Sequence, residues 1–163
     1  MFSDKLIDLT KNIISACKSN NLRLATAESC TGGLIAGCLT AVSGASDVLH
    51  HGYVTYANQA KINLLGIPAS ILGEHGSVSE PVSRAMAEGA IKSEDANIAV
   101  SVTGIAGPGG GSHEKPVGLV HISVARTDYE TLHERHVFDG DRNAVRLQTI
   151  EAALELLLRQ VDA

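Results

Sequence analysis

Segments with the periodicity of amphipathic helices alternate with short apolar segments along this chain, and that alternation limits the folds it can adopt. The helical spacing predicts helices over residues 3–19, 32–42, 59–65, 68–73, 80–90 and 141–161. Apolar runs and two-residue alternation predict strands over residues 22–27, 47–56, 97–102, 118–125 and 132–138. The last two strands follow each other without a helix between them. We therefore expect an α/β fold, a three-layer α/β/α sandwich with a mixed, mainly parallel sheet and a late antiparallel hairpin.

The length of 163 residues favours a single domain spanning residues 1–163. Hydrophobic residues make up 44% of the chain but aromatic residues only 3%, so we expect an aliphatic core. The low aromatic content also argues against a surface that stacks nucleic-acid bases. The net charge of -5 argues against a general nucleic-acid binder, because such a protein presents a basic face to phosphates.

The first residues are not typical of a secretory signal, because Asp4 lies among them and no long apolar run follows. No stretch approaches the roughly 20 apolar residues that a membrane helix needs. The cysteines are Cys17, Cys30 and Cys38, an odd number without framework spacing, which fits a reducing compartment. We expect a cytoplasmic protein with no membrane partner.

A candidate nucleophile, Ser29, lies where the strand over residues 22–27 leads into the next helix. Side chains at such a corner project outside the carboxyl end of the sheet, where α/β folds bind ligands. The amides of Thr31, Gly32 and Gly33, expected in the first helical turn, are free to bind a phosphate or an oxyanion. Ser29 or Thr31 as a simple helix cap is an alternative, and Cys30 as a packed residue or a second nucleophile is another.

A serine nucleophile needs a base, and none of the seven histidines lies in a recognisable triad context. The run His133-Glu134-Arg135-His136 misses the zinc-binding H-E-x-x-H spacing by one residue. On the predicted strand its two histidines face opposite sides of the sheet. We therefore expect no metal site.

Lys61 is a better candidate for the base. Asn58 is expected to cap a helix whose first turn contains Lys61, and Tyr56 is expected to end the preceding strand. The helix dipole and partial burial both lower the pKa of a lysine placed there. A neutral lysine accepts a proton from a serine hydroxyl, and a tyrosine hydroxyl nearby orients the pair or relays the proton. A solvated lysine beside a half-buried tyrosine is the alternative.

A glycine-rich run over residues 103–112 follows the strand at 97–102 and suits a binding loop. It lacks the Gly-Lys-Ser/Thr of a phosphate-binding loop, and Pro108 argues against a dinucleotide-binding turn that opens a helix. Thr103, Ser112 and the loop amides are candidates to hold an anion, with Lys115 in support. A long flexible connection is the alternative.

Three segments together resemble the CinA C-terminal-domain family: TAESCTGG at residues 26–33, GYVTYANQAK at 52–61 and SVTGIAGP at 101–108. HGSVSEP at 75–81, EKPVG at 114–118 and GDR at 140–142 are also similar to it. The likeness covers nearly the whole chain in order. Stand-alone members of this family include nicotinamide mononucleotide deamidases, so the resemblance implies hydrolysis of nicotinamide mononucleotide to nicotinate mononucleotide and ammonia.

The resemblance also implies roles. The family's serine, lysine and tyrosine fall on Ser29, Lys61 and Tyr56. We expect a small-molecule nucleotide substrate, no metal or organic cofactor, no nucleic acid, and a homodimer or another homo-oligomer. The expected substrate-binding residues are the amides of the two glycine-containing turns and three side chains, of which Arg142 suits a phosphate by charge: Thr31, Gly32, Gly33, Asn58, Thr103, Gly104, Ile105, Ala106, Gly107 and Arg142.

Two other functions stay open at this point. One is a nucleotide-binding or regulatory module without turnover. The other is a Ser-Lys peptidase or an amidase with a different substrate, although a short glycine-lined site argues against a peptide.

Overall fold

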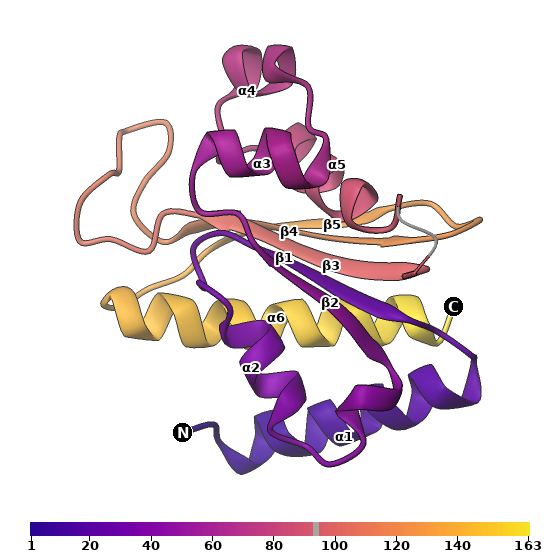
Figure 1. Cartoon of the computed structure of the whole chain (residues 1–163). Helices are drawn as coiled ribbons and strands as arrows, with labels where there is room; N and C mark the ends of the chain where they lie inside the picture. The colour runs from indigo at the N-terminus through magenta and orange to yellow at the C-terminus, as the bar shows by residue number, and fades with distance from the viewer. Residues whose placement is uncertain (93–94) are drawn as a thin grey trace.

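In the described part of the chain, five strands form one sheet in the order β2-β1-β3-β4-β5 (Figure 1). β1 pairs in parallel with β2 and β3, whereas the β3–β4 and β4–β5 pairs are antiparallel. The computed structural model describes residues 1–92 and 95–163. The strands are Leu24–Glu28 (β1), Leu49–Val54 (β2), Ile98–Gly104 (β3), Leu119–Arg126 (β4) and Leu132–Val137 (β5).

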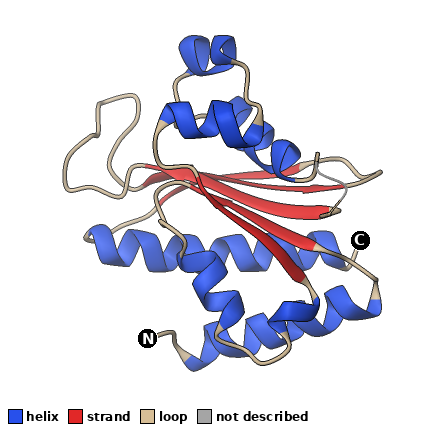
Figure 2. Cartoon of the chain, in the orientation of Figure 1, coloured by secondary structure: helices blue, strands red, loops and turns tan. Residues whose placement is uncertain are grey.

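Helices cover both faces of this sheet, which confirms the expected α/β fold (Figure 2). On one face lie α1, α2 and α6, and on the other α3 and α5, with α4 packed on α5. A short 3-10 helix, η1, precedes β2. The bounds are Asp4–Ser19 (α1), Leu34–Thr40 (α2), Ala45–Asp47 (η1), Asn58–Leu65 (α3), Ala69–His75 (α4), Glu80–Ala90 (α5) and Arg142–Val161 (α6).

The core is aliphatic, as the composition predicts, and consists of two clusters. The larger cluster fills the space between the sheet and α1, α2 and α6, with side chains such as Val100 and Leu154. The smaller cluster lies under α5, where β1 contributes only Ala25 and Ala27. β1 and β3 are buried on both faces, which is why both read as continuous apolar runs.

The helix α3 is held close to α5 by a glycine. A Cβ atom at Gly89 of α5 would collide with the backbone carbonyl of Leu65, the last residue of α3. The absence of a side chain at Gly89 therefore lets α3 lie directly on α5, at the carboxyl edge of β1 and β2.

Several expected boundaries are wrong in detail. The helix expected over 32–42 begins only at Leu34, because Gly32 and Gly33 adopt positive φ angles and form a turn before it. The strand expected over 47–56 ends at Val54, so Tyr56 lies in the following loop. Asn58 is the first residue of α3, and Ala57 occupies the cap position. Leu147, an apolar residue of the helix expected over 141–161, is 44% exposed on α6.

No helix in the described part of the chain is both long enough and apolar enough to cross a membrane.

A pair of histidines is packed between β4, β5 and α5. His121 Nδ1 lies 3.0 Å from His133 Nε2, and the two rings stack at 5.2 Å between centroids. Burial is the main reason why the pKa of His121 falls from 6.5 to about 4, and the nearby His133 and Arg135 lower it further.

We expect the free energy of unfolding to decrease as the pH falls from about 6.5 towards about 4, because unfolded His121 binds a proton in that window and folded His121 does not. A His121→Gln variant keeps a polar partner for His133 and should lose less stability on acidification than the parent. Urea unfolding at about pH 7 and about pH 5 measures the difference. The same pH dependence in both proteins would contradict this assignment.

Candidate active site

Ser29 and Lys61 meet at the carboxyl edge of the sheet. Ser29 directly follows β1, and its amide donates to the carbonyl of Val102 at 3.0 Å. Lys61, on α3, donates from Nζ to Ser29 Oγ at 3.1 Å and to the carbonyl of Thr55 at 2.7 Å. The pairing of Glu28 with Val54 brings the ends of β1 and β2 side by side, so the loop after β2 passes next to Ser29. Parallel pairing thus joins two segments that are far apart in the sequence.

Lys61 is a buried amine without a carboxylate partner among the described residues. Lys61 is only 1% exposed. Burial lowers its pKa from 10.5, with a smaller opposing effect from Cys30. The position of Lys61 in the first turn of α3, where the helix dipole disfavours a cation, acts in the same direction. The result is an amine that loses its proton more readily than a solvated lysine and touches a serine hydroxyl.

Glu28, which sequence reasoning did not single out, fixes the turn that carries Ser29. The residue is fully buried, and its carboxylate accepts four hydrogen bonds. The donors are Thr31 Oγ1 at 2.6 Å and the amides of Gly33, Ile35 and Ala36 at 3.0, 3.0 and 2.9 Å. An acidic residue at the end of an apolar strand, just before a glycine turn and a helix, was the available signal.

This arrangement changes which amides remain for a substrate. The amide of Gly33 is bound to Glu28, and that of Gly32 donates to the carbonyl of Ser29 at 3.1 Å. We expected both amides to bind an anion, but neither is free to do so. The amide of Thr31 donates to no acceptor within the described chain, although Thr31 itself is fully buried in the free protein.

Tyr56 and Arg142 form a second polar group beside the pair. Tyr56 is 58% exposed, and its carbonyl lies 3.4 Å from Lys61 Nζ. Its hydroxyl accepts a hydrogen bond at 2.8 Å from Arg142 Nη2, while Arg142 Nη1 donates to the carbonyl of Gly107 at 2.9 Å. The side chain of Tyr56 is therefore directed to Arg142 and makes no hydrogen bond to Ser29 or Lys61. Asn58 is exposed at the start of α3.

The glycine-rich run lies next to this group. Thr103 is buried, and its hydroxyl donates to the carbonyl of Ser77 at 2.8 Å, so that hydroxyl is already occupied. The amide of Ile105 pairs with Leu119, whereas those of Ala106 and Gly107 have no acceptor among the described residues. A cavity of about 520 Å³ opens here, lined by Ala106, Pro108, Val117, Gly140, Asp141, Arg142 and Asn143.

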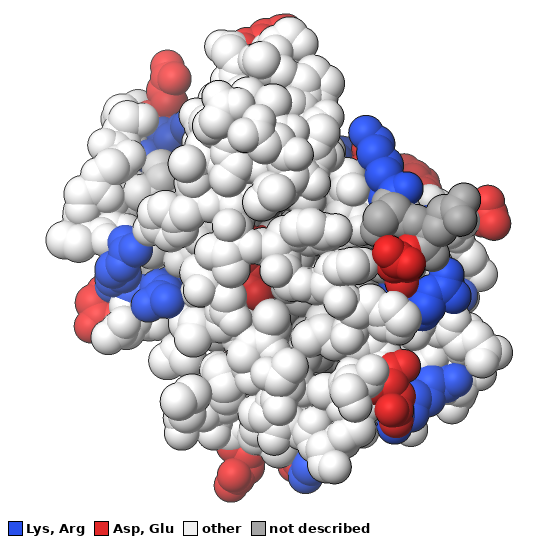
Figure 3. All heavy atoms as spheres, in the orientation of Figure 1, with Lys and Arg blue, Asp and Glu red and all other residues white. Residues whose placement is uncertain are grey.

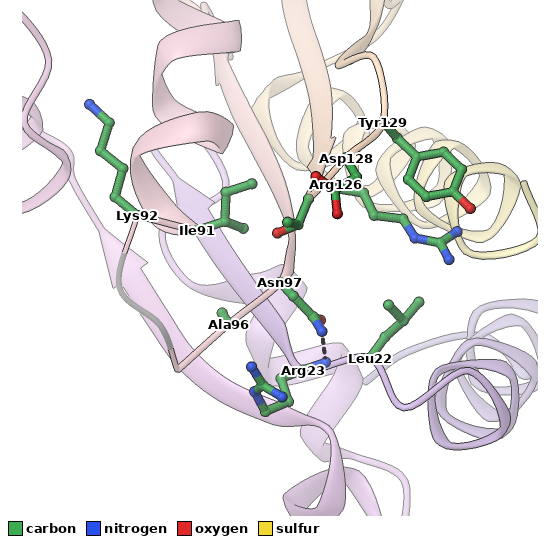
Figure 4. Close-up of a pocket in the computed structure, with 10 residues that line it drawn as sticks. Leu22, Arg23, Ile91, Lys92, Ala96, Asn97, Arg126, Asp128 and Tyr129 are labelled. Atoms are coloured by element: carbon green, nitrogen blue, oxygen red, sulfur yellow. Dashed lines mark hydrogen bonds between the residues drawn. The ribbon is translucent and has the colours of Figure 1, made fainter.

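Another cavity, of about 540 Å³, lies at the opposite end of the strands, where β1 and β3 begin (Figure 4). Its cations do not converge. The guanidinium of Arg126 packs over Tyr129 at 4.1 Å and donates to carbonyls at the end of α6, while Arg23 and Lys92 point elsewhere. Its lining includes no serine, cysteine or histidine, whereas the site at Ser29 combines a serine hydroxyl with a buried amine.

The remaining candidates are structural. Burial raises the pKa of the Cys30 thiol to about 12, so it is not a thiolate nucleophile at neutral pH. His133 faces α5 and His136 stacks on Phe138 on the other side of the sheet, as expected. Among the described residues, no group of three or more histidine, cysteine, aspartate or glutamate side chains is placed to hold a metal ion.

The chain is similar to known proteins in both sequence and fold. The model of the CinA C-terminal domain matches residues 6–161. The nicotinamide-nucleotide amidohydrolase PncC of Escherichia coli strain K12 is 44% identical over 160 residues, covering 98% of this chain and 97% of that protein. A putative competence-damage inducible protein of Caldicellulosiruptor bescii is 47% identical over 94% of this chain, which spans only 37% of that relative. The crystal structure of a competence/damage inducible protein from Agrobacterium tumefaciens superimposes with a TM-score of 0.95 at 44% identity, covering 100% of this chain and 99% of that one.

Replacing Glu28 with glutamine should lower the free energy of unfolding by about 2 kcal/mol, because one amide oxygen cannot satisfy four buried donors and the new NH₂ group opposes them. Urea unfolding provides the measurement. The matched control is Asp141→Asn, which alters an exposed cap that accepts a hydrogen bond from Ala144 on α6 and should cost less than about 1 kcal/mol. Equal losses in the two variants would show that the buried Glu28 carboxylate contributes no more to the free energy of unfolding than the exposed helix cap at Asp141.

Proposed function

The chain belongs to the CinA C-terminal domain family, and from this premise we propose that it is an amidohydrolase that converts nicotinamide mononucleotide to nicotinate mononucleotide and ammonia. One observation carries the proposal: the buried amine of Lys61 lies 3.1 Å from Ser29 Oγ. This amine has no carboxylate partner among the described residues. The likeness to the Escherichia coli nicotinamide-nucleotide amidohydrolase along nearly the whole of both chains supports the substrate.

In the first half of the reaction, Ser29 Oγ attacks the carboxamide carbon while neutral Lys61 takes the hydroxyl proton. The carbonyl π electrons move to oxygen, and the resulting oxyanion accepts hydrogen bonds from free backbone amides. The candidate donors are Thr31, Ala106 and Gly107, whose amides have no acceptor among the described residues. Protonated Lys61 then gives its proton to the leaving nitrogen, ammonia departs, and the acyl group remains on Ser29.

In the second half, water replaces ammonia. Neutral Lys61 removes a proton from water as its oxygen attacks the acyl carbon, and the same proton returns to Ser29 Oγ when the acyl–oxygen bond breaks. Nicotinate mononucleotide is released, and the enzyme is restored. Every step uses side chains, backbone amides and water alone.

We assign Arg142 to the phosphate of the substrate and Tyr56 to the same end of the site. In the free protein the two side chains bind each other, so an anion that engages Arg142 competes with the Tyr56 hydroxyl. Once the hydrogen bond from Arg142 is lost, the Tyr56 hydroxyl can turn towards the departing ammonia. Asn58, exposed at the start of α3, is a further substrate contact in this proposal, as are Thr103 and Gly104 through their backbone.

The same proposal treats residues 1–163 as one amidohydrolase domain that acts in the cytoplasm as a homodimer or another homo-oligomer. Cys17, Cys30 and Cys38 are free and buried, which suits a reducing compartment.

A Ser29→Ala variant should release ammonia from nicotinamide mononucleotide at least about a thousandfold more slowly than the parent, because no nucleophile remains. A coupled ammonia assay on metal-stripped protein measures the rate. The matched variant Cys30→Ala, at the neighbouring position, should keep turnover within about a few fold. The mechanism is wrong if Ser29→Ala retains the parental rate, and calorimetric binding without turnover in the parent would favour a non-catalytic module.

The rate should also report the ionisation of Lys61. Because the neutral amine is the base, kcat should rise with pH and level off above a pKa that lies below 10.5. Lys61→Arg, which stays charged at every accessible pH, should lower kcat by at least about a hundredfold and abolish the rise. An unchanged pH profile in this variant would remove Lys61 from the proposed mechanism.

A further inference from the structure

Arg146, on the second turn of α6, reaches the turn that carries Ser29. Its Nη2 donates a hydrogen bond to the carbonyl of Thr31 at 3.1 Å. A Cβ atom at Gly32 would lie 3.7 Å from the same nitrogen, so the guanidinium lies directly against the backbone of this turn. We call residues 29–33 the serine turn.

The carbonyl that Arg146 binds belongs to the peptide between Thr31 and Gly32. This peptide is trans and planar, so its C=O and its N–H point in opposite directions. The N–H is the amide of Gly32, which donates to the carbonyl of Ser29 at 3.1 Å. One rigid plane therefore connects the guanidinium of Arg146 to the backbone of the candidate nucleophile.

Few other contacts fix this peptide. Its rotation changes ψ of Thr31 and φ of Gly32, and Gly32, which has a φ of 61°, tolerates either sign of φ. Glu28 binds the Thr31 hydroxyl before the peptide and the Gly33 amide after it, but neither polar group of the peptide itself. The other donor to the carbonyl is the amide of Leu34 at 3.3 Å, which is a long bond within the same segment.

Stability alone does not account for the position of Arg146. Its Nε is buried and has no hydrogen-bond partner in the described part of the chain, and a buried donor without an acceptor costs free energy of folding. Arg146 also forms no ion pair among the described residues. By contrast, Arg159 at the far end of α6 is paired with Glu134 at 2.6 Å.

The start of α6 carries a second arginine, Arg142. The two are four residues apart, so they lie on the same face of the helix. Arg142 contacts the Tyr56 hydroxyl and the carbonyl of Gly107, at the end of the site that we assign to the phosphate. Figure 3 shows lysine and arginine side chains gathered over the start of α6, at the left of the view, whereas the surface over α2 and α3 carries almost no charge. The two guanidinium groups therefore contact different parts of the site.

We propose that Arg146 is a positioning residue for the amidohydrolase reaction: it holds the peptide between Thr31 and Gly32 and thereby keeps Ser29 Oγ where Lys61 can take its proton. If this peptide rotated, its carbonyl would face the carbonyl of Ser29, and two acceptors without a donor between them would force the serine turn apart. Arg146 acts through the backbone in this role and does not contact the substrate. The inference rests on the proposed function, because the reaction is read from ammonia release.

The first experiment separates activity from stability. Arg146→Met removes the donor but keeps an unbranched side chain, and it also removes the unpaired Nε, so the midpoint of urea unfolding should stay at or above that of the parent. The kcat for nicotinamide mononucleotide should fall about 10- to 100-fold, because a charge-assisted hydrogen bond is lost. KM should stay within about threefold, since Arg142 remains in place. The matched control Arg159→Met, the same change at the far end of the helix, should keep kcat and KM within about twofold.

A second measurement does not depend on turnover. The amide of Gly32 belongs to the held peptide, so its hydrogen exchange, followed by NMR, should be at least about tenfold faster in Arg146→Met than in the parent. The amide of Ile35, which Glu28 binds at 3.0 Å, should keep its rate. Arg146→Lys retains one donor, which is all that the Thr31 carbonyl requires, and its kcat should lie between those of Arg146→Met and the parent.

Four results would overturn the proposal: parental kcat in Arg146→Met, a lower urea midpoint or a failure of that variant to fold, unchanged exchange at Gly32, or a kcat in Arg146→Lys no higher than in Arg146→Met. Ser29→Ala, assayed in parallel, keeps this test distinct from that of the proposed function. Parental kcat in Arg146→Met beside an inactive Ser29→Ala rejects the positioning role alone. Parental turnover in Ser29→Ala, or none in the parent, rejects the proposed mechanism and this inference with it.

Discussion

The burial of the Glu28 carboxylate is the interaction on which the candidate site depends. A carboxylate removed from water is costly unless its oxygens are hydrogen-bonded. Here the hydroxyl of Thr31 and three backbone amides supply those bonds. The carboxylate can be satisfied only if the turn at Gly32 and Gly33 and the start of α2 take the positions that they have. The location of Ser29, between Glu28 and that turn, follows from the same bonds.

The alternation of side chains along a strand then keeps the Glu28 carboxylate away from the amine of Lys61, with which it would otherwise form an ion pair. Successive side chains of β1 face opposite sides of the sheet. Glu28 accordingly faces α2, while Ser29 faces α3 and Lys61. If the carboxylate lay on the α3 side, it would pair with Lys61, raise the pKa of the amine and keep it protonated. Because the amides of α2 hold Glu28 on the other side, Lys61 has a serine and backbone carbonyls as neighbours, and no carboxylate opposes the lowering of its pKa by burial.

The sequence predicts the order and type of the elements because burial on one or both faces leaves a periodicity in the apolar residues. It also predicts that Ser29 and Lys61 share an edge, since both follow parallel strands. It fails where side-chain partners decide the outcome. The turn at Gly32 and Gly33 was expected to be helical, because the capping carboxylate of Glu28 was not recognised. The hydroxyl of Tyr56 was expected near Lys61, but its partner, Arg142, lies in a helix 86 residues further along the chain and no local pattern reveals it.

Between Ser29 and Gly73 the only aspartate, glutamate, lysine or arginine residues are Asp47 and Lys61, and this scarcity of charge has two separable physical consequences. Near Lys61 it leaves the amine without a carboxylate partner among the described residues, which the proposed chemistry requires. That argument does not reach α2, which lies on the other face of the sheet, where an exposed charge would be screened by solvent within a Debye length of about 8–10 Å. Nor does it reach the outer edge of β2, since an exposed lysine there would protect the strand at little cost. The proposed chemistry therefore accounts for the missing charges around α3, but it does not account for those on the surface of α2 and β2.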